Sequence, residues 1–191
     1  MSGGSYIGNS SHGIISSIDG GTIKNATLDS SVTFPAGGTG NPISVAIIAD
    51  EKASGTSGGT FTSGDWRDRV LNTEVSDSDS IVSISSNQFT LASGTYFIEW
   101  ACQAFEVGYN KTRLYDVTGA TSLSIGLNAY AQPAGNDDAI SSGSYLHTIT
   151  SNNTYKIQHR CSSSATTIGF GIASSFGVVE VYTIVKILKL K

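Results

Sequence analysis

Three histidines and many serines raise the question of hydrolytic chemistry. A serine hydrolase needs its serine on a sharp turn beside a histidine, and the G-x-S-x-G sequence that builds this turn does not occur. No local cysteine–histidine signature occurs either. His159 alternates with apolar residues in TYKIQHRC, which is typical of a core or interface position. We therefore do not expect His147 or His159 to be catalytic, and we predict no enzyme.

Carboxylates occur in neighbouring pairs at Asp50/Glu51, Asp77/Asp79 and Asp137/Asp138. A glycosidase needs two carboxylates that face each other across a cleft, whereas acids in serine- and asparagine-rich loops usually face water. The loops at 77–79 and 136–138 offer the clustered oxygens that Ca²⁺ prefers, but not the regular spacing of an EF-hand. We predict no cofactor, and a structural calcium ion stays open as the alternative.

Cys102 and Cys161 each lie on the apolar side of an alternating segment, so we interpret both as small buried hydrophobic residues. A disulfide between them stays open. A zinc site built from these cysteines with His147 and His159 would lack the close ligand spacing of known zinc sites. The sequence therefore predicts no metal centre.

Trp66, Arg67 and Arg69 lie in the polar stretch SGDWRDRVL. An aromatic ring beside two guanidinium groups could stack on a sugar or grip a neighbouring subunit, which makes these residues the candidates for a binding surface. The alternative is an ion-paired strand edge in which Trp66 covers the core, because tryptophan is mostly buried on average.

The elements that must position these residues read as strands. Residues 81–105 predict two strands around a Leu-Ala-Ser-Gly turn, the second with Tyr96, Ile98 and Trp100 on one side. Further strands are expected at Ile43–Ala49, Lys111–Val117, Leu123–Ala131, Tyr145–Thr150, Thr154–Cys161, Ile168–Ala173 and Val179–Leu190. The linkers lack the helical periodicity that parallel crossovers would need. The fold class predicted is therefore an all-β antiparallel sandwich, a jelly roll.

Composition excludes several classes of partner. Charged residues make up 14% of the 191 residues, the net charge is −4, and there are 22 glycines, as in a rigid β-rich structural protein. The acidic balance offers no general attraction to nucleic acid or to anionic membranes. No apolar run is long enough to span a bilayer, and the first residues do not resemble a secretory signal. We expect no nucleic-acid partner, no membrane insertion and synthesis in a cytoplasm.

The chain is expected to divide near Pro42, into an arm with a short β-stem at 1–41 and a knob at 42–191. Ile18, Ile23 and Leu28 recur every five residues in the arm. So short a repeat cannot bury its apolar row alone, and a three-fold axis would let three such rows face one another. The alternative is a loosely attached tail.

The last strand, VEVYTIVKILKLK, is apolar on both sides, with Tyr182, Ile184 and Leu188 on one of them. We expect one side to enter the sandwich core and the other to approach a three-fold axis. The residues predicted to form a trimer interface are Ile18, Ile23, Leu28, Tyr96, Ile98, Trp100, Tyr182 and Ile184.

Several segments together resemble a known group: NATLDSSVTFPAG, SGGTFTSGDWRDRVLNTEVSD, GTYFIEW, NTYKIQHRC and GFGIASSFG. They resemble trimeric knob domains of bacteriophage virion proteins, and the topology is similar to the jelly roll of the tumour-necrosis-factor and complement globular-head superfamily. The resemblance covers about residues 23–191. It implies a compact homotrimer in which the FTLASGTYF stretch lines a three-fold interface, and it brings no catalytic residue.

These observations predict a non-enzymatic, homotrimeric virion protein, assembled in the host cytoplasm, that decorates the capsid or forms a short head fibre. Only about 40 residues precede the knob, so we expect no long shaft. The arm would bind capsid shell or tail proteins. The alternative is a tail-fibre tip that recognises a host surface glycan or protein through loops such as 131–143. A secreted cytokine-like ligand would share the fold but would need a signal peptide.

Overall fold

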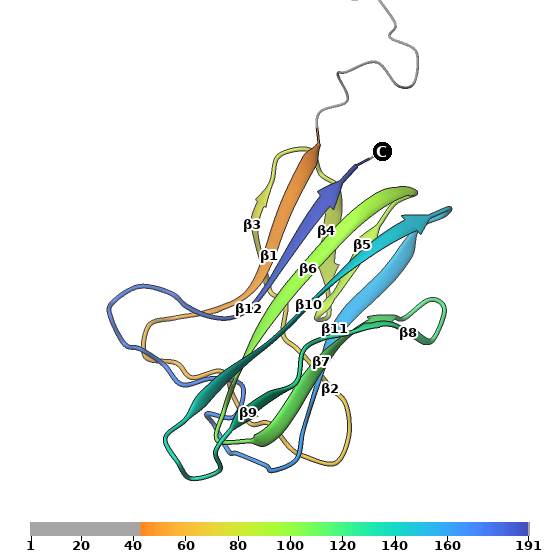
Figure 1. Ribbon diagram of the computed structural model, residues 1–191. Coiled ribbons are helices and arrows are strands. Elements are labelled where there is room, and N and C mark those ends of the chain that lie inside the picture. The colour runs from red at the N-terminus through yellow and green to blue at the C-terminus, as the bar shows by residue number, and fades with distance from the viewer. Residues whose placement is uncertain (1–42, 191) are drawn as a thin grey trace, which may run out of the picture. The chain divides into compact units, whose positions relative to one another are not determined.

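The computed structural model describes residues 43–190, which form two antiparallel sheets packed face to face (Figure 1). The sheet we call the β6 sheet has the order β10-β6-β12-β1-β3. Its strands are β1 (Ser44–Lys52), β3 (Thr73–Asp77), β6 (Gly94–Phe105), β10 (Asp138–Ile149) and β12 (Glu180–Lys189). The prediction of an all-β jelly roll is confirmed.

The second sheet, which we call the β11 sheet, has the order β4-β5-β11-β7-β8. Its strands are β4 (Val82–Ser85), β5 (Gln88–Leu91), β7 (Gly108–Asp116), β8 (Thr121–Ile125) and β11 (Asn153–Cys161). Two short strands lie off this path: β2 (Arg67–Asp68) pairs with β11, and β9 (Ala129–Ala131) pairs with β7. No helix long and apolar enough to cross a bilayer occurs in residues 43–190.

The core lies between the two sheets and follows the period-two pattern of the sequence. Tyr96 and Ile98 on β6 face Tyr155 and Ile157 on β11, and all four belong to one buried cluster. Because successive side chains of a strand point to opposite sides, the residues between them face outward. Full burial of each large apolar side chain contributes about 1.5–3 kcal/mol.

Trp100 shows how tightly the two sheets are joined. Its indole N–H donates a hydrogen bond of 2.7 Å to the hydroxyl of Thr112 on β7, and that hydroxyl lies 2.9 Å from the Ser141 hydroxyl on β10. Gly143 lies directly opposite Trp100 in the register, where any Cβ atom would overlap the indole ring. The buried ring therefore requires a glycine on the neighbouring strand.

One predicted strand is wrong. Residues 168–173 form turns and coil rather than a strand, because glycines at 169 and 171 let this segment fold against the sandwich. Phe170 stacks on Phe61 with ring centroids 4.4 Å apart. The segment therefore acts as a lid on the second, smaller apolar cluster. The segment predicted at 123–131 is also divided, into β8 and β9.

The strands β1 and β12 are antiparallel neighbours, with Ser44 opposite Lys189. The chain therefore enters and leaves the sandwich at the same end, as Figure 1 shows. The loop between β9 and β10 lies at the opposite end. Ile18, Ile23 and Leu28, like the rest of the predicted arm, lie outside the described residues.

Candidate functional site

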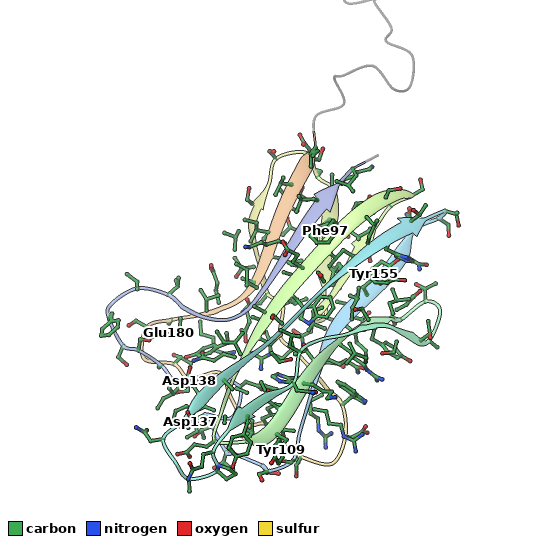
Figure 2. The ribbon with its side chains drawn as sticks, in the orientation of Figure 1. Phe97, Tyr109, Asp137, Asp138, Tyr155 and Glu180 are labelled. Atoms are coloured by element: carbon green, nitrogen blue, oxygen red, sulfur yellow. The ribbon has the colours of Figure 1, made fainter. Side chains whose placement is uncertain are left out.

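The predicted interface residues of β6 are not available to a partner. Tyr96 and Ile98 are 0% exposed and Trp100 is 2% exposed within a single chain. Their assignment to a trimer interface is therefore wrong, because these side chains fill the space between the two sheets. The outward residues of β6 are those between them, among which Phe97 is labelled in Figure 2.

Tyr182 is also buried, although it belongs to the last strand and was expected at the interface. Its hydroxyl donates a 2.8 Å hydrogen bond to the carbonyl of Thr56. Gly171, at φ +133°, packs against its ring, where a Cβ atom would collide with it. Loops at one end of the sandwich therefore cover Tyr182, and its assignment to an interface is wrong as well. Ile184, two residues later, lies on the outward side and is partly exposed.

The outward side of the β6 sheet carries rows of apolar side chains. One row crosses four strands through the pairs Val45–Leu188, Leu188–Phe97 and Phe97–Leu146. Leu146 is 61% exposed and Val45 is 42% exposed. We call this outward surface of β1, β12, β6 and β10 the apolar face. It leaves large hydrophobic groups in water in the isolated chain, which is typical of a surface that contacts another protein.

A groove of about 500 Å³ lies on the apolar face. Its floor includes Ala101 and Ile184, which are opposite each other in the register, and its rim includes Glu99 and Lys186, which are also opposite each other. Leu127 and Ile125, 68% and 53% exposed, border it beyond the edge of β10. The lining of this groove combines apolar side chains with one pair of opposite charges and with Ser142 and Ser144.

Arg69 was predicted to lie on a binding surface, and this is wrong: it is 0% exposed. Its guanidinium donates to the carbonyl oxygens of Gln103, Phe170 and Tyr182 and to the hydroxyl of Thr183. Its own backbone N–H donates to a carbonyl of β11. Arg69 therefore clamps the two sheets and the 168–173 segment together. Burial lowers the pKa of Arg69, and the pKa of the nearby buried Asp50 is raised by burial.

Trp66 and Arg67 do lie at the surface, beside the edge of β11. The Arg113 guanidinium lies 4.2 Å above the Trp66 ring and 4.7 Å from the Tyr115 ring, and it donates two hydrogen bonds to the Gln158 side-chain oxygen. Arg113 and Tyr115 belong to this surface but are not among the site residues predicted from the sequence. The alternation in YNKTRLY, which places residues 109, 111, 113 and 115 on one side of β7, was the signal that could have found them.

Both cysteines are buried and unpaired, and burial raises the pKa of each thiol to about 11. Each is therefore a neutral thiol at neutral pH. His159 is buried, with its Nε2 atom 3.0 Å from the Asn110 side-chain oxygen. Burial, followed by the charge of Arg69, holds its pKa well below the ordinary value. Among residues 43–190, no three potential metal ligands come together.

Several carboxylates hold loops in place. Asp77 accepts hydrogen bonds from the backbone N–H groups of Ile81 and Val82. Asp137 accepts one from Gln132. Glu180, labelled in Figure 2, accepts hydrogen bonds from the backbone N–H groups of Gly55, Ser174 and Ser175, and these bonds lower its pKa. These carboxylates therefore act as hydrogen-bond acceptors for the backbone of loops and turns.

Comparison with solved structures places the fold among the jelly rolls. The TNF protein Eiger of S. frugiperda is 9% identical, with a TM-score of 0.53 over 79% of this chain and 94% of that chain. Murine APRIL is 7% identical, with a TM-score of 0.50 over 78% and 100%. The globular domain of the zebrafish complement 1qA protein is 13% identical, with a TM-score of 0.49 over 78% and 98%.

No family model matches the sequence, and no curated protein is similar to it at a significant level. Identities this low show a shared fold alone, and fold does not fix function. Residues 43–190 therefore have the jelly-roll architecture of Eiger and APRIL, and what this chain does with it has to be argued from its own surfaces.

Proposed function

We propose that this chain is a non-enzymatic structural protein of a bacteriophage virion, a homotrimer that decorates the capsid or forms a short head fibre. The observation that carries the proposal is the apolar face. A row of four hydrophobic side chains, from Val45 through Leu188 and Phe97 to Leu146, crosses four of the five strands of the β6 sheet.

Self-association is the simplest way to cover this surface. Buried apolar area stabilises by about 25 cal/mol per Å² before the entropy of association is subtracted, so a dry contact over the row is favourable. Each copy of the chain carries the same row, and a closed three-fold arrangement lets every copy bury it. The charges of Glu99 and Lys186, adjacent in the register, could fix how the copies are aligned.

The placement on a virion rests on the resemblance of the segments quoted above, together with one geometric point. The sandwich begins and ends at one pole, with Ser44 opposite Lys189. Residues that precede β1 join the domain at that pole, so an anchoring arm at 1–41 would leave the loops of the other pole free to face solvent. This geometry suits a knob that stands on a particle.

The second candidate is a fibre tip that binds a host receptor. The observation in its favour is the pair of exposed tyrosines, Tyr109 and Tyr130, whose rings lie 4.8 Å apart near the pole away from Ser44 (Figure 2). Aromatic side chains left in water at a distal pole are a common feature of recognition surfaces.

Two measurements test the proposal with the full chain. Light scattering after size-exclusion chromatography should give three times the mass of one chain, and a monomeric mass would overturn the self-association. Cryo-electron microscopy of purified particles, with a gold-labelled antibody, should place the protein over the head. Label confined to the tail would favour the second candidate, and absence from the particle would overturn both.

A further inference from the structure

A second groove, of about 840 Å³, lies on the outward side of the β11 sheet and is lined by both Trp66 and Tyr109. Strands β7 and β11 form its floor, and the loop before β2 and the start of β9 form its sides. Its lining includes Trp66, Tyr109, Lys111, Asn128 and Arg160. We call it the basic groove.

Two cations face each other in the basic groove. Lys111 and Arg160 are directly opposite in the β7–β11 register, and both point outward because their neighbours Thr112 and His159 are buried in the core. Like charges at opposite positions of a sheet destabilise it. Within residues 43–190, no carboxylate lies within 4.0 Å of either cation, whereas Lys156 on the same sheet pairs with Asp68 at 3.0 Å. The structure therefore maintains an uncompensated positive site.

Aromatic rings border these cations. Tyr109 is 74% exposed, and its ring packs against that of Tyr130, so its orientation is held while its surface stays open to water. Trp66 lines the same groove and carries the Arg113 guanidinium over its ring. A ring that is held in place and yet exposed, as Tyr109 is, offers a flat apolar surface to a ligand without a large loss of conformational entropy.

We propose that the basic groove binds an acidic saccharide. Its carboxylate would lie between Lys111 and Arg160, because a guanidinium fork matches the two oxygens of a carboxylate. The apolar side of the sugar ring would pack on Tyr109 or Trp66. The Asn128 side chain, with both donor and acceptor groups, would bind hydroxyls.

A single-stranded nucleic acid would also use cations and stacking rings, but the chain as a whole opposes it. The net charge is −4, and the cations that line the groove are one local pair, Lys111 and Arg160, rather than a track that follows a phosphate backbone. A ligand with one carboxylate for each ring unit fits this spacing of charge and aromatic surface better than a polyphosphate does.

The inference deepens the second candidate function by naming its ligand class, and it does not depend on self-association. The basic groove lies on the β11 sheet, whereas the apolar face belongs to the β6 sheet. Failure of one therefore leaves the other intact, and measurement of the mass of every variant separates the two.

The test uses the full chain on an array of saccharides printed in matched pairs, each carboxylate-bearing glycan beside its carboxyl-reduced form. Binding to at least one acidic member, with a loss of at least tenfold on its reduced form, is the expected result. Arg160→Gln and Tyr109→Ala should each weaken that binding at least tenfold. The matched control Lys156→Gln, which removes a cation of the same sheet outside the groove, should leave it within twofold.

Three results with the unchanged chain would overturn the proposal: no acidic glycan bound, equal binding to acidic and reduced forms, or tighter binding to a single-stranded oligonucleotide than to any saccharide. Unchanged affinity in both Arg160→Gln and Tyr109→Ala would also overturn it, because the ligand would then lie elsewhere. Thermal unfolding of each variant confirms that a loss of binding is not a loss of fold.

Discussion

The two outward faces of the sandwich carry opposite chemistry on the same kind of backbone. The apolar face of the β6 sheet has a row of four hydrophobic side chains with one pair of opposite charges beside it. The outward side of the β11 sheet has cations and aromatic rings, joined by hydrogen bonds and cation–π contacts such as that of Arg113 with Trp66. The inner sides of both sheets, in contrast, are mostly apolar, with a few hydrogen-bonded polar side chains such as Thr112 and Ser141.

This difference shows that the residue types of the core and those of the outward faces are limited by separate requirements. Inward residues must fill one dry space, so their types are limited. Outward residues are free to differ, and each face is suited to one kind of partner: a dry surface for another copy of the chain, and a charged aromatic surface for a hydrated ligand. Four experiments test this difference between the two faces.

The largest expected effect is on assembly. Leu146→Asp places a charge in the middle of the apolar row, where a trimer would have to bury it without a partner. We expect the trimer to dissociate completely, so that the mass measured by light scattering falls from that of three chains to that of one. The matched control is Tyr109→Asp, which changes another exposed residue, on the other sheet, and it should remain trimeric. If both variants stay trimeric, the apolar face is not the interface.

The next effect is on Arg69, which clamps the two sheets and the 168–173 segment together. Arg69→Met removes four hydrogen bonds and leaves buried carbonyl oxygens without a donor. Each such group costs about 1–3 kcal/mol, so we expect the free energy of unfolding to fall by at least about 3 kcal/mol. Urea denaturation measures it. The control is Arg67→Met at the exposed edge, with an expected change within about 0.5 kcal/mol. Equal effects in the two variants would contradict the role of Arg69.

A smaller effect depends on pH and concerns the β11 sheet. The folded pKa of His159 is far below the value of about 6.5 in the unfolded chain, so protons bind preferentially to the unfolded state. Stability should therefore be complete above about pH 6.5 and fall as the pH drops below it, by at most about 1.4 kcal/mol per pH unit. Urea midpoints at pH 7.5, 6.5 and 5.5 measure the fall. His159→Gln should flatten it, and an unchanged slope would show that other groups cause it.

The smallest effect is a gain in stability. Lys111→Thr removes the like-charge pair with Arg160 and puts a β-branched residue in the strand. We expect the free energy of unfolding to rise by about 0.2–1 kcal/mol, while binding of an acidic glycan weakens. Thermal unfolding and glycan titration of the same preparation measure the two changes. A variant that is both less stable and equally good at binding would show that the cation pair is not retained for a ligand.

Much of the fold follows from the sequence, and the site follows only in part. The alternation in GTYFIEWACQAF predicts β6 and its two sides correctly, because apolar residues recur at every second position and side chains of a strand point to the same side at every second position. The same alternation led Tyr96, Ile98 and Trp100 to be assigned to an interface. A sequence shows which residues share a side, but only the packing of the two sheets shows that this side is enclosed.

Arg69 illustrates what a sequence does not carry at all. In SGDWRDRVL it looks like its neighbour Arg67, yet one is buried and the other exposed. The carbonyl groups that satisfy Arg69 come from segments more than 30 residues away along the chain, at Gln103, Phe170 and Tyr182. The apolar face and the basic groove are likewise assembled from strands distant in sequence, so only the sheet register brings their residues together.

The neighbouring positions of Ser44 and Lys189 have a mechanical consequence. Tension applied between the two ends of the domain would break the hydrogen bonds of the β1–β12 pair one after another. Because each bond is loaded alone, the force needed to separate the two strands is small. Tension between the Ser44 end and a ligand held at the far pole would instead run along the strands and load many hydrogen bonds at once. We expect the second direction to withstand the larger force in single-molecule pulling, which suits a domain anchored at one end and pulled at the other.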